Sequence, residues 1–188
     1  MQMMKKSRLS LIKNILFYVL AIFLVSYLVF NVVAPEKTVE VYGFKTFVII
    51  SPSMQPTINV NDAVMVRKIN PDNLEVGDII TFEAYLSDLG DTSYVTHYLG
   101  SKEEVNGKII FKTHAEGTEA LDEWKDEFDN PVDITEDDLI GKVAFRIPKA
   151  GYVINLLSDP IMLLLLGLNI GIIVYIVHYV KASKKKLK

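Results

Sequence analysis

Two long apolar runs constrain this chain more than any other feature of its sequence. Residues 15–33 form a run of 19 residues without a formal charge, and residues 161–180 form a second run of 20. At about 1.5 Å per helical residue, each run is long enough to cross a hydrocarbon core about 30 Å thick. The alternative is a buried core helix, but such helices rarely lack a polar face. The sequence therefore predicts two transmembrane helices, at 15–33 and 160–180.

The distribution of charge predicts how these helices are oriented. All 23 acidic residues lie between Glu36 and Asp159, and together with 11 basic residues they give that segment a net charge of −12. The other nine basic residues lie at 1–14 and 181–188. Positively charged flanks stay in the cytoplasm. We therefore expect cytoplasmic ends at 1–14 and 181–188, an extracytoplasmic domain at 34–159, and a location in the cell (plasma) membrane.

A cleaved signal peptide is the alternative interpretation of the first run, because Val32–Ala34 resembles a cleavage site. The run is longer than the usual signal core of about 7–15 residues, and Pro35 would directly follow the cut. The sequence therefore favours a retained anchor. The chain has no cysteine, so the outer segment has no disulfide, no thiol nucleophile and no thiolate metal ligand.

The outer segment has the pattern of a mainly β domain. Apolar residues alternate with polar ones or form short runs, and Asn106-Gly107 is a typical two-residue hairpin turn. The fold class predicted from these features is a mainly β extracytoplasmic domain between two transmembrane α-helices. The predicted strands are Val39–Ile50, Ala63–Ile69, Asp78–Phe82, Tyr94–Leu99 and Leu139–Ile147.

An acidic segment interrupts this pattern at residues 115–138, where eleven acids stand against one base, Lys125. Such a segment is typical of a solvated loop. Calcium binding is the alternative, but the D-x-D-x-D-G spacing of a calcium loop is absent. We expect no required metal, no other cofactor and no nucleic-acid partner.

The strongest chemical signal is the sequence S-P-S-M-Q-P-T at Ser51–Thr57, which follows the β-branched run Thr46–Ile50. A strand that ends at such a turn presents a hydroxyl beside backbone N–H groups, which suits a nucleophilic serine with an oxyanion site. An ordinary surface turn is the alternative. A serine nucleophile also needs a base, and the outer segment offers His97, His114 or a lysine.

Four segments, in order, resemble the type I signal peptidases. Ser51–Thr57 is similar to their S-G-S-M-x-P-T box, and Asn61–Val66 resembles the strand that follows it. Val95–His97 resembles the V-T-H of the endoplasmic-reticulum and archaeal branch, also found in some Gram-positive bacteria. There histidine replaces the lysine of most bacterial enzymes. Arg146–Val153 resembles that branch's R-I-P-x-x-G-Y-V, which leads into a second membrane span.

This resemblance implies a role for each matching residue. Ser53 corresponds to the nucleophile and His97 to the general base, while the Ser51 hydroxyl and the Ser53 N–H correspond to the oxyanion hole. His114 falls where the family has lysine in its acid box, so it ranks second to His97 as the base. The small side chains expected before the cleavage site suggest shallow pockets, for which the wall candidates are Phe47, Ile50 and Val64.

The acid is less clearly marked. The family has F-x-T-K-G-D-N-N and then a second aspartate, whereas this chain has F-K-T-H-A-E-G-T-E-A-L-D at Phe111–Asp122. Asp122 matches the second aspartate, which makes it the catalytic acid. Glu116 falls on the first, as a secondary candidate. The chain also departs from the family in having Pro52 for glycine and Tyr98 for the common arginine.

The resemblance implies a signal peptidase-like domain and a membrane-bound serine endopeptidase with a Ser/His/Asp mechanism. Such an enzyme removes N-terminal signal peptides from secreted or surface preproteins after small residues. Its expected partners are those preproteins and the lipid bilayer, and accessory subunits are not implied. Two alternatives remain open. One is a catalytically degenerate assembly factor for surface proteins or pili, and the other is a non-enzymatic, membrane-anchored binding domain.

Overall fold

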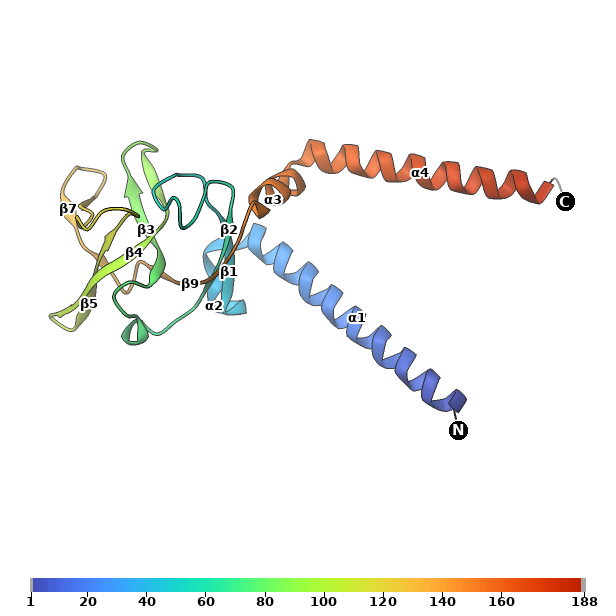
Figure 1. Ribbon diagram of the computed structural model, residues 1–188, viewed down its shortest axis with the longest axis horizontal. Coiled ribbons are helices and arrows are strands. Elements are labelled where there is room, and N and C mark those ends of the chain that lie inside the picture. Colours follow the sequence, from blue (N-terminus) through green and yellow to red (C-terminus); the bar gives the residue numbers. More distant parts are fainter. Residues whose placement is uncertain (1, 187–188) are drawn as a thin grey trace. The chain divides into compact units, whose positions relative to one another are not determined.

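A computed structural model describes residues 2–186, which form two compact units that we describe separately. The first unit comprises the chain up to Thr46 together with Met65–Phe145, and the second comprises Phe47–Val64 and the chain from Arg146 onward. Seven strands form a sheet in the order β1-β2-β9-β3-β4-β5-β8, and β6 pairs with β7 (Figure 1). The mainly β character predicted from the sequence is confirmed.

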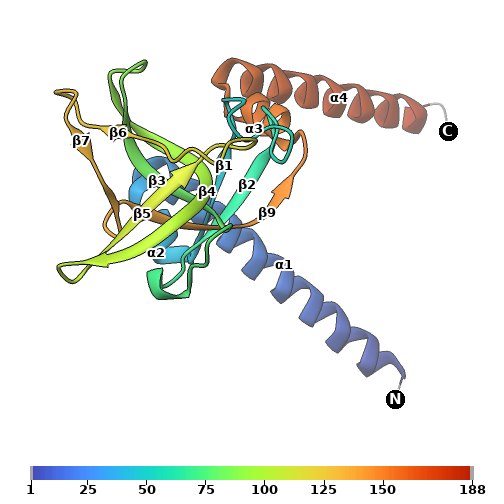
Figure 2. The same cartoon turned by 60° about the vertical axis from the view of Figure 1, so that its left-hand side comes forward.

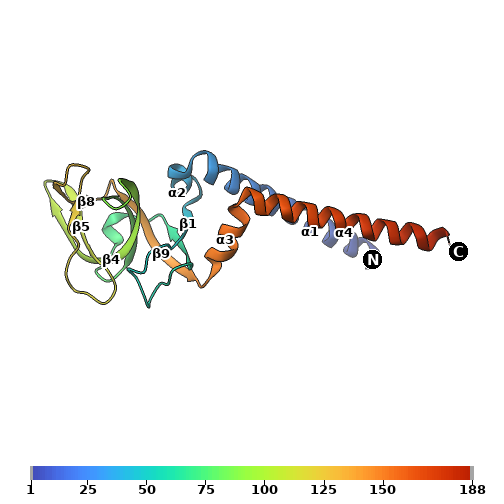
Figure 3. The same cartoon turned by 90° about the horizontal axis from the view of Figure 1, so that it is seen from above.

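The strands are β1 (Phe44–Val48), β2 (Ala63–Arg67), β3 (Ile79–Leu86), β4 (Asp91–Val105), β5 (Lys108–His114), β6 (Trp124–Lys125), β7 (Pro131–Val132), β8 (Ile134–Thr135) and β9 (Leu139–Ile147). The helices are α1 (Gln2–Val33), α2 (Thr38–Tyr42), α3 (Ala150–Ser158) and α4 (Pro160–Lys186), with 3-10 turns η1 (Pro35–Lys37) and η2 (Pro71–Asn73). In the second unit, α3 and α4 follow each other at an angle (Figure 3).

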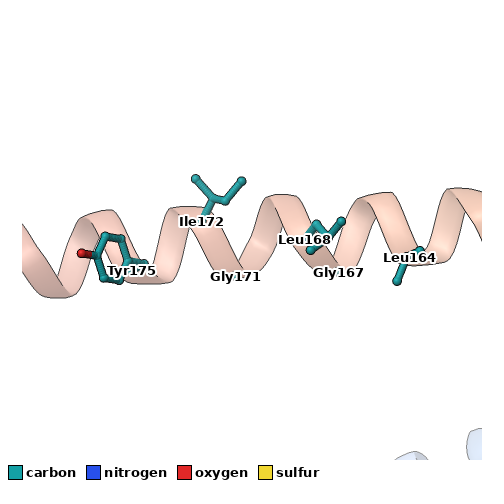
Figure 4. A pocket seen from close by; sticks show the side chains of 6 residues that line it. All are labelled: Leu164, Gly167, Leu168, Gly171, Ile172 and Tyr175. Carbon is teal, nitrogen blue, oxygen red and sulfur yellow. The ribbon is translucent and has the colours of Figure 1, made fainter.

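Helix α1 has the length and composition of a membrane span or of a signal sequence. Its segment Ser10–Val33 has 24 residues, a mean hydropathy of 2.5, and none of its apolar window is buried. Among the described residues it is the one helix long and apolar enough to cross a bilayer, whereas α4 contributes the shorter apolar stretch Leu164–Tyr179. The second span therefore stays a prediction. Along α4 a shallow apolar groove is lined by Leu164, Gly167, Leu168, Gly171, Ile172 and Tyr175 (Figure 4).

The predicted strand Val39–Ile50 is wrong in its first half. The chain forms helix α2 there, and β1 begins only at Phe44. Pro35 stands at the start of the helical segment, and Gly43 follows α2 with a φ of 77°. A proline at the first position and a left-handed glycine after the last are boundary signals of a helix, and here they outweigh the alternation of valines. The Tyr42 ring then packs against the α1 rings of Phe23, Tyr27 and Phe30.

The core of the first unit lies on one face of β3, β4 and β5, which run side by side (Figure 2). β3 and β4 pair antiparallel from Ile79↔Tyr98 to Leu86↔Asp91. The predicted hairpin turn joins β4 to β5, because Asn106 and Gly107 have φ values of 55° and 78°, as a type I′ turn requires. The buried core residues are Leu74, Ile80, Phe82, Ala84, Leu99, Phe111 and Ile134.

The acidic segment 115–138 is more structured than the predicted solvated loop. Trp124 packs its ring against Phe82 of the core, at a centroid distance of 5.3 Å. Ile134 is 3 % exposed and pairs opposite Phe111 of β5. Two apolar side chains thus hold the segment on the core, while most of its acids remain in solvent.

Candidate active site

Strand β4 places His97 on the core face of the sheet. His97 pairs opposite Ile80 of β3, and side chains two apart along a strand share a face, so the imidazole lies on the same side as Leu99. The imidazole side chain is only 9 % exposed. A histidine at such a position needs a hydrogen-bond partner, because burying an unpaired polar group is costly.

The partner of His97 is Asp122. The Nδ1 atom of His97 lies 2.7 Å from Oδ2 of Asp122, and the Thr113 hydroxyl donates to the same oxygen at 2.7 Å. The backbone N–H of Asp122 also donates to the carbonyl of Thr113 at 2.7 Å. Burial on its own would raise the pKa of Asp122, but the hydrogen bonds from His97 and Thr113 outweigh it, so the pKa lies below its usual value. Asp122 is therefore ionised at neutral pH.

This arrangement determines the tautomer of His97. An ionised carboxylate only accepts hydrogen bonds, so Nδ1 of the neutral imidazole carries the proton in its contact with Asp122. The other ring nitrogen, Nε2, then keeps its lone pair. That is the tautomer a general base requires, because Nε2 is free to accept a proton from a hydroxyl.

Glu116 and His114 lie on the opposite face of the sheet from His97. Tyr98 follows His97 directly, so its side chain points the other way, and its hydroxyl donates to Oε2 of Glu116 at 2.9 Å. The Tyr98 ring stacks on His114, at a centroid distance of 5.3 Å. The structure therefore brings Asp122, and not Glu116, to the imidazole of His97.

Two further residues of this site were missed by the sequence analysis. The indole Nε1 of Trp124 donates to the Thr113 hydroxyl at 3.0 Å, and the Trp124 ring lies 5.9 Å from that of His97. One signal could have indicated Thr113, because it stands two residues after the apolar Phe111 that follows the predicted Asn106-Gly107 turn, and residues two apart on a strand share a face. The single tryptophan of the chain, in an otherwise polar segment, was the signal for Trp124.

The serine turn lies in the second unit. Ser51 and Pro52 are exposed and Ser53 is half-buried, while Met54 is only 1 % exposed and anchors the turn. The hydroxyl oxygens of Ser51 and Ser53 lie 3.2 Å apart. The N–H of Gln55 donates to the Pro52 carbonyl at 3.0 Å, so Pro52 contributes to the turn as an acceptor.

An ion pair between the buried Asp62 carboxylate and the exposed Arg146 side chain closes the loop that carries this turn. The Asp62 carboxylate accepts from the backbone N–H groups of Asn59 and Lys149, both at 2.9 Å, and lies 3.3 Å from the Arg146 guanidinium. Arg146 also donates to the Thr57 carbonyl. Burial would raise the pKa of Asp62, but the backbone N–H groups and the charge of Arg146 lower it below its usual value. The sequence analysis predicted neither this pair nor its role.

Of the three residues predicted to line shallow pockets, only two have exposed surface. Ile50 is 77 % exposed beside the serine turn, and Phe47 is half-buried. Val64 has no exposed surface, so the prediction that it lines a pocket is wrong.

The structure thus brings together His97 and Asp122 in the first unit and Ser51 and Ser53 in the second. Among residues 2–186, no group of three or more histidine, aspartate or glutamate side chains is arranged to hold a metal ion. No protein-family model matches the chain, and no curated protein matches it.

Proposed function

We propose that this protein is a membrane-bound serine endopeptidase of the type I signal peptidase kind, in the histidine-dependent branch. It removes N-terminal signal peptides from secreted or surface preproteins after small residues. The observation that carries the proposal is the contact between His97 and Asp122, two residues 25 positions apart that meet at 2.7 Å. The resemblance assigned them as base and acid, and the tautomer that follows from their contact is the one a base needs.

In the proposed mechanism, Nε2 of His97 takes the proton of the Ser53 hydroxyl as Oγ attacks the scissile carbonyl carbon. The Ser53 N–H and the Ser51 hydroxyl stabilise the oxyanion of the tetrahedral intermediate. The imidazolium then protonates the leaving amine, the C–N bond breaks, and the signal peptide stays on Ser53 as an ester. Water, deprotonated by His97, hydrolyses the ester and restores Ser53. Asp122 remains ionised and stabilises the imidazolium in both steps.

The proposed topology places this chemistry at the outer face of the plasma membrane. In it, α1 crosses at 15–33 and α4 at 160–180, with both basic ends in the cytoplasm. The support is the charge distribution, since nine bases lie outside the acidic segment. A signal peptide lies in the bilayer and its cleavage site emerges at the outer face, so a domain anchored there meets its substrate directly.

The test is cleavage of a preprotein by the full-length chain in detergent, followed by N-terminal sequencing of the product. We expect a new N-terminus after a small residue, and no product from Ser53→Ala. Ser51→Ala should lower kcat by about 10²–10³, the effect of losing one oxyanion donor. Ser93→Ala on β4 is the matched control and should cleave normally. Cleavage by Ser53→Ala would exclude this nucleophile, and a wild-type chain that cleaves no preprotein would favour an assembly factor or a binding domain.

A further inference from the structure

We infer that Thr113 and Trp124 are positioning residues of the same site. They form a hydrogen-bond relay that runs from the Trp124 indole through the Thr113 hydroxyl to Asp122, and it holds the carboxylate that orients His97. The inference deepens the proposed function, because it assigns the residues that keep the acid in place. Neither side chain is placed to touch the substrate in this role.

The chemistry of the three groups allows only one direction for the relay. An indole N–H can only donate, and an ionised carboxylate can only accept. The Thr113 hydroxyl stands between them, 3.0 Å from Nε1 of Trp124 and 2.7 Å from Oδ2 of Asp122. It must therefore accept from the indole and donate its own proton to Asp122.

The relay is also rigid, because its ends are fixed by the core and by the backbone. Thr113 has no exposed surface, and the Trp124 ring packs against Phe82. The Asp122 N–H is bound to the Thr113 carbonyl, so this aspartate is tied to β5 by its main chain and its side chain. In such a shielded site a hydrogen bond is stronger than in water, and leaving a partner unpaired costs more.

The relay matters for His97 because both donors share one oxygen. Nδ1 of His97 and the Thr113 hydroxyl each lie 2.7 Å from Oδ2 of Asp122. Without the hydroxyl, one side-chain donor remains, and the carboxylate can rotate about its terminal bond. The imidazole would then spend less time in the orientation and tautomer that catalysis needs.

Thr113→Val tests this directly, since valine has nearly the same shape but no hydroxyl. We expect kcat to fall roughly 10- to 100-fold, the scale of one hydrogen bond to a charged group, with KM unchanged. Thr113→Ser keeps the hydroxyl and should restore kcat to within a few-fold of wild type. Trp124→Phe keeps the ring but loses the N–H, and should give an intermediate loss of kcat.

Thr81→Val is the matched control. Thr81 is another threonine with no exposed surface, and its hydroxyl bonds to that of Thr96 at 2.8 Å, on the sheet face opposite His97. This variant should lose stability without a change in kcat. If Thr113→Val does not fold, Trp124→Phe compared with wild type decides the question.

A second measurement does not depend on activity. The chain has three histidines, so ¹⁵N-imidazole labelling gives few resonances, and His97→Gln assigns the one of interest. We expect the Nδ1-bound proton of His97 to exchange slowly with water in wild type and Thr113→Ser, and at least several-fold faster in Thr113→Val. Wild-type kcat and wild-type exchange in Thr113→Val would overturn the relay, even where Ser53→Ala is inactive. Faster exchange in a chain that cleaves nothing would support the relay and refute the proposed function.

Discussion

At the scale of single residues, the face of β4 on which a side chain lies decides which acid serves the imidazole. His97 and Tyr98 are neighbours in sequence but point to opposite sides of the sheet. Asp122 reaches His97 on the core side, whereas Glu116 is bound by the Tyr98 hydroxyl on the other side. The motif alignment already ranks Asp122 above Glu116, and the two faces of β4 give the physical reason for that ranking.

This geometry predicts a ranking of the two acids. Asp122→Asn should lower kcat for preprotein cleavage by roughly 10³–10⁴, because the amide no longer stabilises the imidazolium or selects its tautomer. Glu116→Gln should change kcat only a few-fold, since the amide oxygen still accepts from Tyr98. Steady-state kinetics on both variants provide the comparison. A larger loss in Glu116→Gln would reassign the acid.

Whether a residue of the site could be predicted depends on how far apart in sequence its interacting partners lie. Ser53, His97 and Asp122 stand in short motifs that can be identified from their order along the chain. Thr113 and Trp124 stand in no such motif, and their roles arise only when the acidic segment folds back onto β5. The ion pair of Asp62 with Arg146 joins positions 84 apart in sequence, so no local pattern could indicate it.

At the scale of elements, the serine turn depends on how closely α3 approaches the loop before β2. The N–H of Gly151 donates to the Asn61 carbonyl at 2.9 Å. A Cβ atom on Gly151 would lie 2.7 Å from that carbonyl oxygen and 2.6 Å from Cγ1 of Val48, closer than real contacts allow. Only glycine fits there, which gives a physical reason for the glycine of the R-I-P-x-x-G-Y-V segment.

Gly151→Ala is therefore expected to push α3 away from the loop. We expect a loss of about 1–3 kcal/mol in unfolding free energy, typical of overpacking, together with slower cleavage. Gly167→Ala in α4 is the control, because nothing lies within 4 Å of its Cβ position and alanine favours a helix. Thermal unfolding in detergent, followed by circular dichroism, measures both variants. If Gly151→Ala melted at the same temperature as wild type, the close approach of α3 to the loop before β2 would be contradicted.

Because the pKa of Asp62 is lowered in the folded state, we expect the stability of the protein to depend on pH. The Asp62 carboxylate stabilises the fold at pH values above the ordinary pKa of about 3.9, and this contribution is lost as the pH falls through the folded pKa. Wild type should therefore exceed Asp62→Asn in melting temperature most clearly near pH 7, and the difference should shrink below about pH 4. A difference that stays constant from pH 7 to pH 3 would show that ionisation of Asp62 is irrelevant.

Elements with a clear local signal were predicted well from the sequence. The strand Leu139–Ile147 ends where Pro148 follows, and the Asn106-Gly107 turn has the backbone angles its residues favour. Helix α2 was missed because the alternation of valines favours a strand, although Pro35 begins the preceding 3-10 turn and Gly43 follows the helix. Strands β6, β7 and β8 were missed because the acidic segment contains few apolar residues, so its composition favours a solvated loop.

At the scale of the whole molecule, the separation of charge predicts which parts face the outside. A protease added to intact cells should cleave the acidic segment at Glu119–Asp129 and spare the basic ends at 1–14 and 181–188. Epitope tags on each end, detected with and without permeabilisation, provide the measurement. Cleavage of the C-terminal tag from outside would contradict a second span in α4, and release of the whole domain after residue 34 would identify α1 as a signal sequence.

A lysine can also act as the general base of a serine peptidase, so any buried lysine in the chain is an alternative to His97. Lys45 is the strongest rival, since burial lowers its pKa, partly offset by the charges of Glu83 and Glu36. Its ammonium group donates to the Pro35 carbonyl at 2.9 Å and lies 4.5 Å from the centre of the Tyr94 ring. These contacts indicate a structural lysine, so Lys45→Met should reduce stability and leave most of the activity.

The most direct measurement is kcat/KM for cleavage of one preprotein by wild type, His97→Ala, His114→Ala and Lys45→Met, each confirmed as folded. We expect His97→Ala to show no detectable cleavage, with His114→Ala and Lys45→Met within a few-fold of wild type. The same product, with the same N-terminus, should come from every active variant. Wild-type activity in His97→Ala, or loss of activity in Lys45→Met with His97→Ala still active, would contradict a serine peptidase that uses His97 as its base.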